Sequence, residues 1–105
     1  MHVQVIYIGR IRSKAGQRSE VVEVQPGTTV LRMLEQLVAK YGDEFKKTVF
    51  DDNQLAPGLN VIIDGLNVTK HVMTRDEGSV ARLPAQDAKN PEVELVLLDA
   101  PPSGG

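Results

Sequence analysis

The two residues with the clearest chemical potential are the last of the sequence, Gly104 and Gly105. Neither has a side chain, so together they can enter a channel too narrow for any Cβ atom and adopt backbone conformations closed to other residues. Pro101, Pro102 and Ser103 precede them, and the prolines favour an extended path away from the fold. We therefore expect a thin probe with the carboxylate of Gly105 at its tip.

A carboxylate is a poor electrophile and must be activated before one of its oxygens can be replaced. An acyl-adenylate made from ATP has a good leaving group, and its unhindered glycine carbonyl is open to sulfur or nitrogen nucleophiles. The sequence shows no catalytic machinery of its own, since it has no cysteine and its two histidines lie far apart. The predicted site is the carboxylate of Gly105, with Gly104, Ser103, Pro102 and Pro101 inserted into a partner's active site, and neither metal nor bound cofactor.

Length and charge limit the classes of protein to which the chain can belong. A domain of 105 residues is long enough to bury a core without disulfides or metal. Its 12 basic and 14 acidic residues argue against nucleic-acid binding, because such domains usually carry a basic face. No apolar run approaches a bilayer span, and the first residues lack the layout of a signal peptide. We expect a cytoplasmic protein without a membrane partner.

The predicted elements begin with two strands joined by a turn. The segment 3–11 is rich in β-branched and aromatic residues and almost continuously apolar, which is typical of a central strand. The stretch 12–18 is polar and contains a glycine suited to a turn. The segment 19–25 then alternates, with Val22 and Val24 on one face. These features predict a hairpin.

The clearest helical pattern covers residues 30–41. Thr28 or Thr29 can cap this helix, and Gly42 is placed to end it in a left-handed conformation. Apolar residues recur every three or four positions along it and predict one buried stripe. They are Val30, Leu31, Leu34, Leu37, Val38 and Tyr41.

Three further strands are predicted in the second half of the chain. The stretch 43–58 is compatible with another helical turn or with irregular packing. Residues 59–63 are typical of a strand, Asp64-Gly65 of a tight turn, and 66–69 of a short returning partner. The final strand is expected over 92–99, directly before the tail.

The order of hairpin, helix, short strands and last strand predicts an α+β fold of the β-grasp (ubiquitin-like) class. In this fold a mixed sheet of four to five strands carries one main helix across one face. That crossover lets the first and last strands lie parallel at the centre. We expect one domain over 1–99 and an extended flexible tail over 100–105. The open face of the sheet is the expected docking surface, although the weak alternation of its strands does not assign the residues.

With these features the sequence resembles the ubiquitin-like sulfur carriers of the MoaD/ThiS type, and its ending is similar to that of the small subunit of molybdopterin synthase. The resemblance is carried by Pro26-Gly27-Thr28-Thr29, by Ile62-Ile63-Asp64-Gly65 and by the tail 101–105. Two features depart from the family. Its Asp-Gly-Asp turn is replaced by Asp87-Ala88-Lys89-Asn90-Pro91, and the segment 74–90 is longer than typical.

The resemblance implies that a ubiquitin-activating-type adenylyltransferase uses ATP to adenylate Gly105, and that a sulfur donor converts it to a thiocarboxylate. In molybdopterin synthase this group inserts into the large subunit, which would be a further partner, and gives its sulfur to a pterin precursor. One alternative is a protein modifier joined through Gly105 to lysines. Another is a β-grasp binding module whose Gly-Gly ending is incidental. The tail serves the carrier and the modifier equally well.

Other residues are expected to have structural or surface roles. The aromatic residues predicted in the core are Tyr7, Phe45 and Phe50. The polar residues expected at a solvated surface are Asp51, Asp52, His71, Arg75, Arg82, Lys46 and Lys47.

Overall fold

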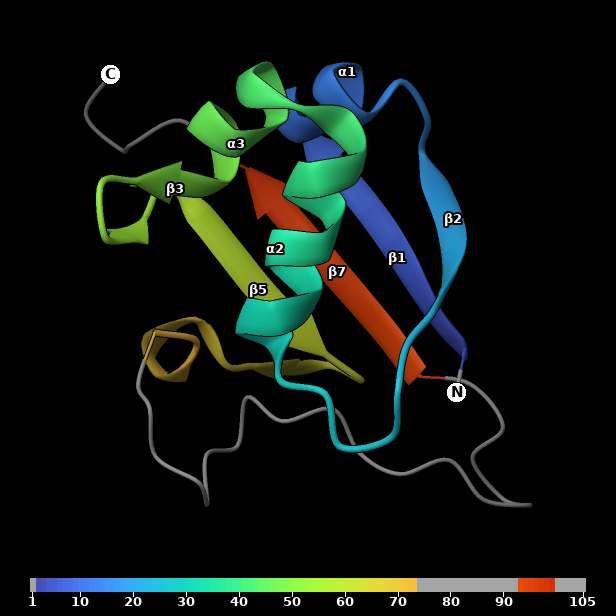
Figure 1. Cartoon of the computed structure of the whole chain (residues 1–105). Coiled ribbons are helices and arrows are strands. Elements are labelled where there is room, and N and C mark those ends of the chain that lie inside the picture. Colours follow the sequence, from blue (N-terminus) through green and yellow to red (C-terminus); the bar gives the residue numbers. More distant parts are fainter. Residues whose placement is uncertain (1, 74–92, 100–105) are drawn as a thin grey trace.

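The computed structural model describes residues 2–73 and 93–99, which fold around a five-stranded sheet in the order β2-β1-β7-β5-β6 (Figure 1). The strands are β1 His2–Gly9, β2 Ser19–Glu23, β5 Leu59–Ile63, β6 Leu66–Asn67 and β7 Val93–Asp99. β1 and β7 run parallel at the centre, and their other neighbours in the sheet are antiparallel. The mixed sheet with the first and last strands side by side confirms the predicted β-grasp topology.

The link between β1 and β2 differs from the prediction. β1 ends at Gly9 rather than at Ile11, and a six-residue helix, α1 Arg10–Ala15, replaces the expected turn. Ile11 and Ala15 lie four positions apart on one side of this helix, and both are buried. Their burial holds α1 against the domain. Gly16 then ends α1 in a left-handed conformation, with φ of 76°.

The helix α2 Val30–Tyr41 has the predicted bounds and crosses one face of the sheet (Figure 1). Thr29 is its N-cap, because the Thr29 hydroxyl accepts a hydrogen bond from the Arg32 N–H at 3.2 Å. The predicted stripe omitted Met33, which is fully buried. Met33 lies one turn after the buried Val30 and therefore shares its face of the helix.

The stretch 43–58, for which the sequence allowed either a helical turn or irregular packing, contains a helix and a small hairpin. Gly42 has the expected positive φ, 92°, but its ψ of −163° lies outside the left-handed helical region. This conformation turns the chain directly into α3 Asp43–Val49. β3 Phe50–Asp51 and β4 Gln54–Leu55 then pair as a separate two-stranded ribbon. After β6 comes one 3₁₀ turn, Thr69–His71.

The predicted turn at Asp64-Gly65 joins β5 to β6 and also contacts β7. Both residues have positive φ, 47° and 86°, as a tight two-residue hairpin loop requires. The Asp64 N–H donates to the Glu94 carbonyl, and the Glu94 N–H donates to Asp64 Oδ1, each at 2.9 Å. The turn is thereby attached to the first residues of β7.

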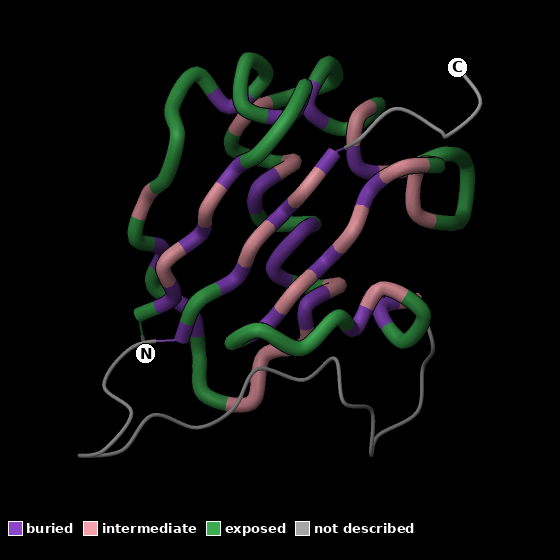
Figure 2. Tube along the Cα trace, turned by 180° about the vertical axis from the view of Figure 1, so that it is seen from behind, coloured by how far each residue is buried: buried purple, intermediate pink, exposed green. Residues whose placement is uncertain are grey.

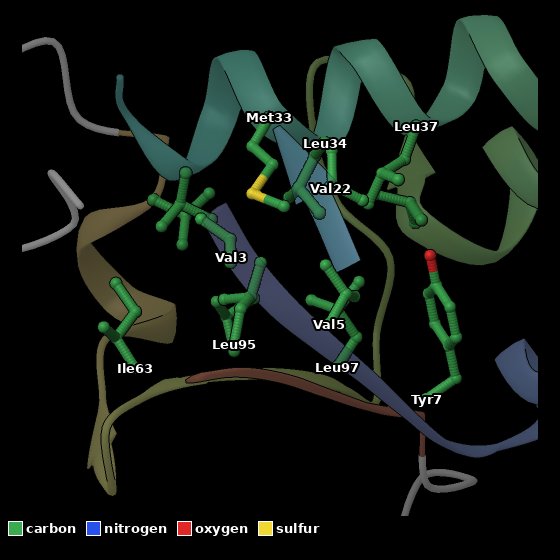
Figure 3. Packing of buried hydrophobic residues seen from close by; sticks show 14 of the residues in the cluster. Val3, Val5, Tyr7, Val22, Met33, Leu34, Leu37, Ile63, Leu95 and Leu97 are labelled. Carbon is green, nitrogen blue, oxygen red and sulfur yellow. The ribbon is translucent and has the colours of Figure 1, made fainter. Parts of the chain in front are cut away.

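The hydrophobic core fills the space between α2 and the sheet (Figure 3). Buried residues alternate with more exposed ones along β1, β5 and β7, so each strand has one core face (Figure 2). Tyr7 meets Phe45 edge-on, with ring centroids 6.1 Å apart and an interplanar angle of 88°. Both are fully buried, as predicted, whereas Phe50 is partly buried and packs at the margin of the core.

Glu20 ties the edge strand β2 to α2. Only 8% of its side chain is exposed, and its Oε2 accepts hydrogen bonds from the hydroxyls of Tyr7, at 2.6 Å, and Tyr41. Its Oε1 pairs with Lys40 Nζ at 2.5 Å. Burial alone would raise the pKa of Glu20, but the hydrogen bonds from Lys40 and the two tyrosines outweigh it and hold the pKa below its usual value. Burial raises the pKa of Tyr7, which keeps its hydroxyl a donor.

The Glu20→Gln variant tests the contribution of this cluster to stability. Near neutral pH we expect a loss of about 2 kcal/mol in the free energy of unfolding, because hydrogen bonds to a charged acceptor are lost. A carboxylate with a lowered pKa stabilises the fold above its unfolded pKa of about 4.3 and loses that contribution as the pH falls through the folded value. In urea unfolding the deficit should shrink on acidification. The exposed Glu23→Gln on the same strand is the control, and an equal deficit at every pH would contradict the assignment.

Candidate functional site

The residues predicted to form the site, Pro101, Pro102, Ser103, Gly104 and Gly105, lie outside the described residues. So do the segment 74–90, with Arg75 and Arg82, and the first residue of the predicted last strand. What the structure gives is the point from which the tail departs. That point is Asp99, the last residue of β7.

Asp99 is held by an ion pair with Arg10. Asp99 is 2% exposed and lies on the core face of β7, in line with Leu95 and Leu97. Arg10 Nε donates to Asp99 Oδ2 at 3.2 Å, and Arg10 Nη2 donates to Oδ1 at 3.3 Å. Arg10 begins α1, and its side chain is 62% exposed. The pair therefore has one buried partner in the strand and one solvated partner in the helix.

Gly9 approaches the same residue through its backbone. Gly9 is opposite Asp99 in the parallel ladder and has a φ of 92°. A Cβ atom added to Gly9 would lie 2.0 Å from the Asp99 carbonyl oxygen. Only glycine permits this approach. Both the side chain and the carbonyl of Asp99 are thus in close contact with the residues that connect β1 to α1.

A hollow with charged walls lies beside Asp99, where α1, α3 and β3 come together. Its lining residues are Arg10, Lys14, Glu44, Lys47, Thr48, Phe50, Asp51, Asp52, Ala56, Pro57 and Asp99. Glu44 Oε2 lies 3.9 Å from Lys14 Nζ, and Glu44 Oε1 lies 3.8 Å from Lys47 Nζ. Lys47, Asp51 and Asp52 are exposed, as the sequence predicted. Their position beside the start of the tail was not predicted.

The face of the sheet opposite α2 carries an apolar cluster. In the described part of the chain no helix covers this face (Figure 2). The register places Ile6 opposite Val96 and Val96 opposite Ile62, and it places Ile8 opposite Leu98. We call these five residues the open-face cluster. All are partly exposed, with Ile8 at 40%. The strand pairing therefore assigns the outward residues that local alternation left open.

The remaining candidates are not among the residues that line the hollow beside Asp99. His71 is exposed in the 3₁₀ turn, and Lys46 is exposed on α3. Among residues 2–73 and 93–99, no three His, Cys, Asp or Glu side chains are grouped so as to hold a metal ion. Within the same residues no helix combines the length and apolar character needed to cross a membrane.

Several solved structures have a similar fold, and each aligns with almost the whole chain. Small archaeal modifier protein 1 of Haloferax volcanii is 23% identical, with a TM-score of 0.65 and full coverage of both chains. Small archaeal modifier protein 1 of Methanosarcina acetivorans is 24% identical, with a TM-score of 0.67 over 99% of this chain and 95% of that one. A candidate molybdopterin converting factor subunit 1 of Pyrococcus furiosus is 22% identical, with a TM-score of 0.65 over 97% of this chain and 98% of that one.

The fold is the ubiquitin-like β-grasp. It is shared with small archaeal modifiers and with a MoaD-like factor, which confirms at the level of fold the resemblance to MoaD/ThiS-type proteins. The sequence itself matches no family model and no curated protein.

The sequence did not predict that Arg10 and Asp99 form an ion pair at the last residue before the tail. The two are 89 positions apart, so no local motif contains them both. One signal was present in the last strand. Counting in steps of two from Leu95 and Leu97 places Asp99 on the core face of the β-grasp sheet, and an aspartate there requires a buried partner.

Substitution of Gly9 tests the close backbone approach. Gly9→Ala should lower the free energy of unfolding by about 3 kcal/mol or more, because the new Cβ atom collides with the Asp99 carbonyl and the backbone is already strained for any other residue. The matched control is Gly16→Ala, which has a positive φ but no atom within 4 Å of the added Cβ. Its expected cost is about 1 kcal/mol. Equal losses in urea unfolding would contradict the predicted collision.

Proposed function

We propose that this protein is a sulfur carrier. A ubiquitin-activating-type enzyme adenylates the carboxylate of Gly105, and a sulfur donor converts it to a thiocarboxylate. The observation that carries the proposal is the position of Asp99. The central strand of a ubiquitin-like sheet ends there, and the sequence continues directly into Ala-Pro-Pro-Ser-Gly-Gly. The proposal takes Gly105 as the C-terminal residue.

The chemistry needs a partner enzyme, and the chain supplies the substrate. An oxygen of the Gly105 carboxylate attacks the α-phosphorus of ATP, and pyrophosphate leaves. Hydrosulfide supplied by the sulfur donor then attacks the glycine carbonyl carbon, AMP leaves, and the thiocarboxylate remains. The absence of a side chain at Gly104 and Gly105 lets the carbonyl enter a narrow active site. The thiocarboxylate serves molybdopterin synthesis, with the synthase large subunit as partner, or a related sulfur-transfer pathway.

The second candidate function is protein modification through Gly105. It is favoured by a specific observation, because two of the similar structures are small archaeal modifier proteins. The adenylate is the same, but the nucleophile is then the amine of a lysine on another protein. Sulfur transfer and conjugation differ only after activation, and one chain can take part in both.

The open-face cluster is the surface we assign to docking on the activating enzyme. It lies on the outer side of β1, β5 and β7, and its row Ile8–Leu98 lies next to the end of β7. A partner seated there would cover partly exposed apolar side chains and would also lie close to the start of the tail. Apolar burial of this kind gives binding energy without requiring any change of the core.

Mass spectrometry of the intact protein from its native host tests the carrier function. We expect a species in which one oxygen is replaced by sulfur, on a chain that ends at Gly105. Deletion of Gly104 and Gly105 should abolish ATP-dependent activation by the cognate enzyme and leave the thermal unfolding curve unchanged. Gly-Gly remnants on lysines of other proteins would identify the modifier function. Activation that survives the deletion would refute both.

A charge within the open-face cluster tests the docking surface. Ile8→Asp should raise KM for activation on the order of tenfold, equivalent to ~1.4 kcal/mol of binding, while kcat stays near the wild-type value. Leu66→Asp is the matched control, since Leu66 is 59% exposed on the edge strand β6 and pairs with Ile63, which is on the core side of the sheet. Both variants should unfold within about 3 °C of wild type. Equal KM values for the two variants would place docking elsewhere.

A further inference from the structure

The five strands of the sheet contain neither lysine nor arginine. Every lysine and arginine among the described residues lies in a helix, in the loop before β2 or in the 3₁₀ turn. On the face of the sheet seen in Figure 2, the charged residues of β2 and β7 are the acidic Glu23 and Glu94. The surface around the open-face cluster is therefore free of basic strand residues.

Glu94 lies next to the open-face cluster, toward the start of β7. Glu94 and Val96 are both on the outer side of this strand, so about 7 Å separates them along it. Glu94 is exposed, and its partner in the ladder with β1 is the uncharged Gln4. The outer face is thus apolar toward the end of β7, where the sequence continues into the tail, and acidic toward its start.

Asp64 adds a second carboxylate at the acidic end. Its Oδ1 accepts a hydrogen bond from the Glu94 N–H at 2.9 Å, so the two acidic residues are adjacent. Neither of them takes part in an ion pair with another described residue. Like charges side by side repel each other, and a cation that arrives at this position is attracted by both.

A partner seated on the open-face cluster comes close to these carboxylates. Covering a carboxylate without a cation costs desolvation energy, whereas a lysine or arginine that faces it offsets this cost. Charges at the rim of an apolar interface also speed association and exclude partners of the same sign. The apolar cluster supplies the buried area, and the acidic end selects among the apolar surfaces that could cover it.

We propose that the surface that docks on the open-face cluster carries a lysine or arginine that meets Glu94 and Asp64. The charge lies at one end of the cluster only. It therefore orients the partner along β7, with the cation at the start of the strand and the apolar contacts toward its end. This inference rests on the proposed function, because it names the chemistry of the activating enzyme's contact surface.

Charge reversal at Glu94 tests the inference. With ATP and the activating enzyme purified from the native host, Glu94→Lys should raise KM on the order of tenfold and leave kcat near the wild-type value. Added NaCl screens charges, so the difference in KM between the two proteins should shrink as salt rises. The matched control is Glu35→Lys, which makes the same change of charge at an exposed position of α2, on the other side of the sheet. It should keep the wild-type KM.

A second measurement separates charge from shape. The chain has no cysteine, so Glu94→Cys provides a single thiol. Methanethiosulfonate reagents attach to it, through a disulfide, either a sulfonatoethyl or a trimethylammonioethyl group, which are similar in size and opposite in charge. The sulfonate should keep KM within about twofold of wild type, and the ammonium should raise it on the order of tenfold. The same two groups on Glu35→Cys should give equal KM values.

The outcomes separate this inference from the proposed function. Wild-type protein that shows no activation dependent on Gly105 would refute the proposed function, and this inference with it. If wild type is activated but KM is the same for both groups at position 94, the inference alone is overturned. A KM that rises equally for Glu94→Lys and Glu35→Lys would also overturn it, because net charge rather than the acidic end would then govern docking.

Discussion

The parallel pairing of β1 with β7 joins the first strand of the chain to the last, and the other elements are arranged around it. Parallel neighbours require a crossover, and α2 lies across the sheet as part of that connection. The register sets Val5 opposite Leu95 and Tyr7 opposite Leu97 beneath the helix. The same register sets Ile6 opposite Val96 on the outer side. One pairing therefore creates both the core and the open-face cluster.

At the end of this pairing the character of the contacts changes. Up to Leu97 the core face of β7 is apolar, and at Asp99 it becomes ionic. Opposite Asp99 the neighbouring strand ends at Gly9, and the chain turns into α1. The last ladder position is thus held by an ion pair and by a backbone contact that excludes other residues at Gly9. The chain therefore leaves the fold from a residue that is held by both a side-chain and a backbone contact.

The sequence predicted those parts of the structure that depend on neighbouring residues. The bounds of α2 follow from its apolar spacing and the Thr29 cap, and the turn at Asp64-Gly65 follows from residues suited to positive φ. The end of β1 did not follow, because α1 is polar except for Ile11 and Ala15, whose burial depends on α3 and the sheet. The base of the tail could not be predicted from local pattern either. It combines residues from the two ends of the chain, which come together only after folding.

The direction of the two central strands also separates the two ends of the domain. β1 starts beside the start of β7, with Val3 opposite Val93, whereas the tail begins at the far end of the pair, beside Gly9 (Figure 1). Six residue steps along a strand separate these points, or about 20 Å. A tag or a whole domain attached ahead of His2 would therefore be held away from the departing tail. The amino end is the side on which this protein can be extended, immobilised or labelled while its carboxyl end stays accessible.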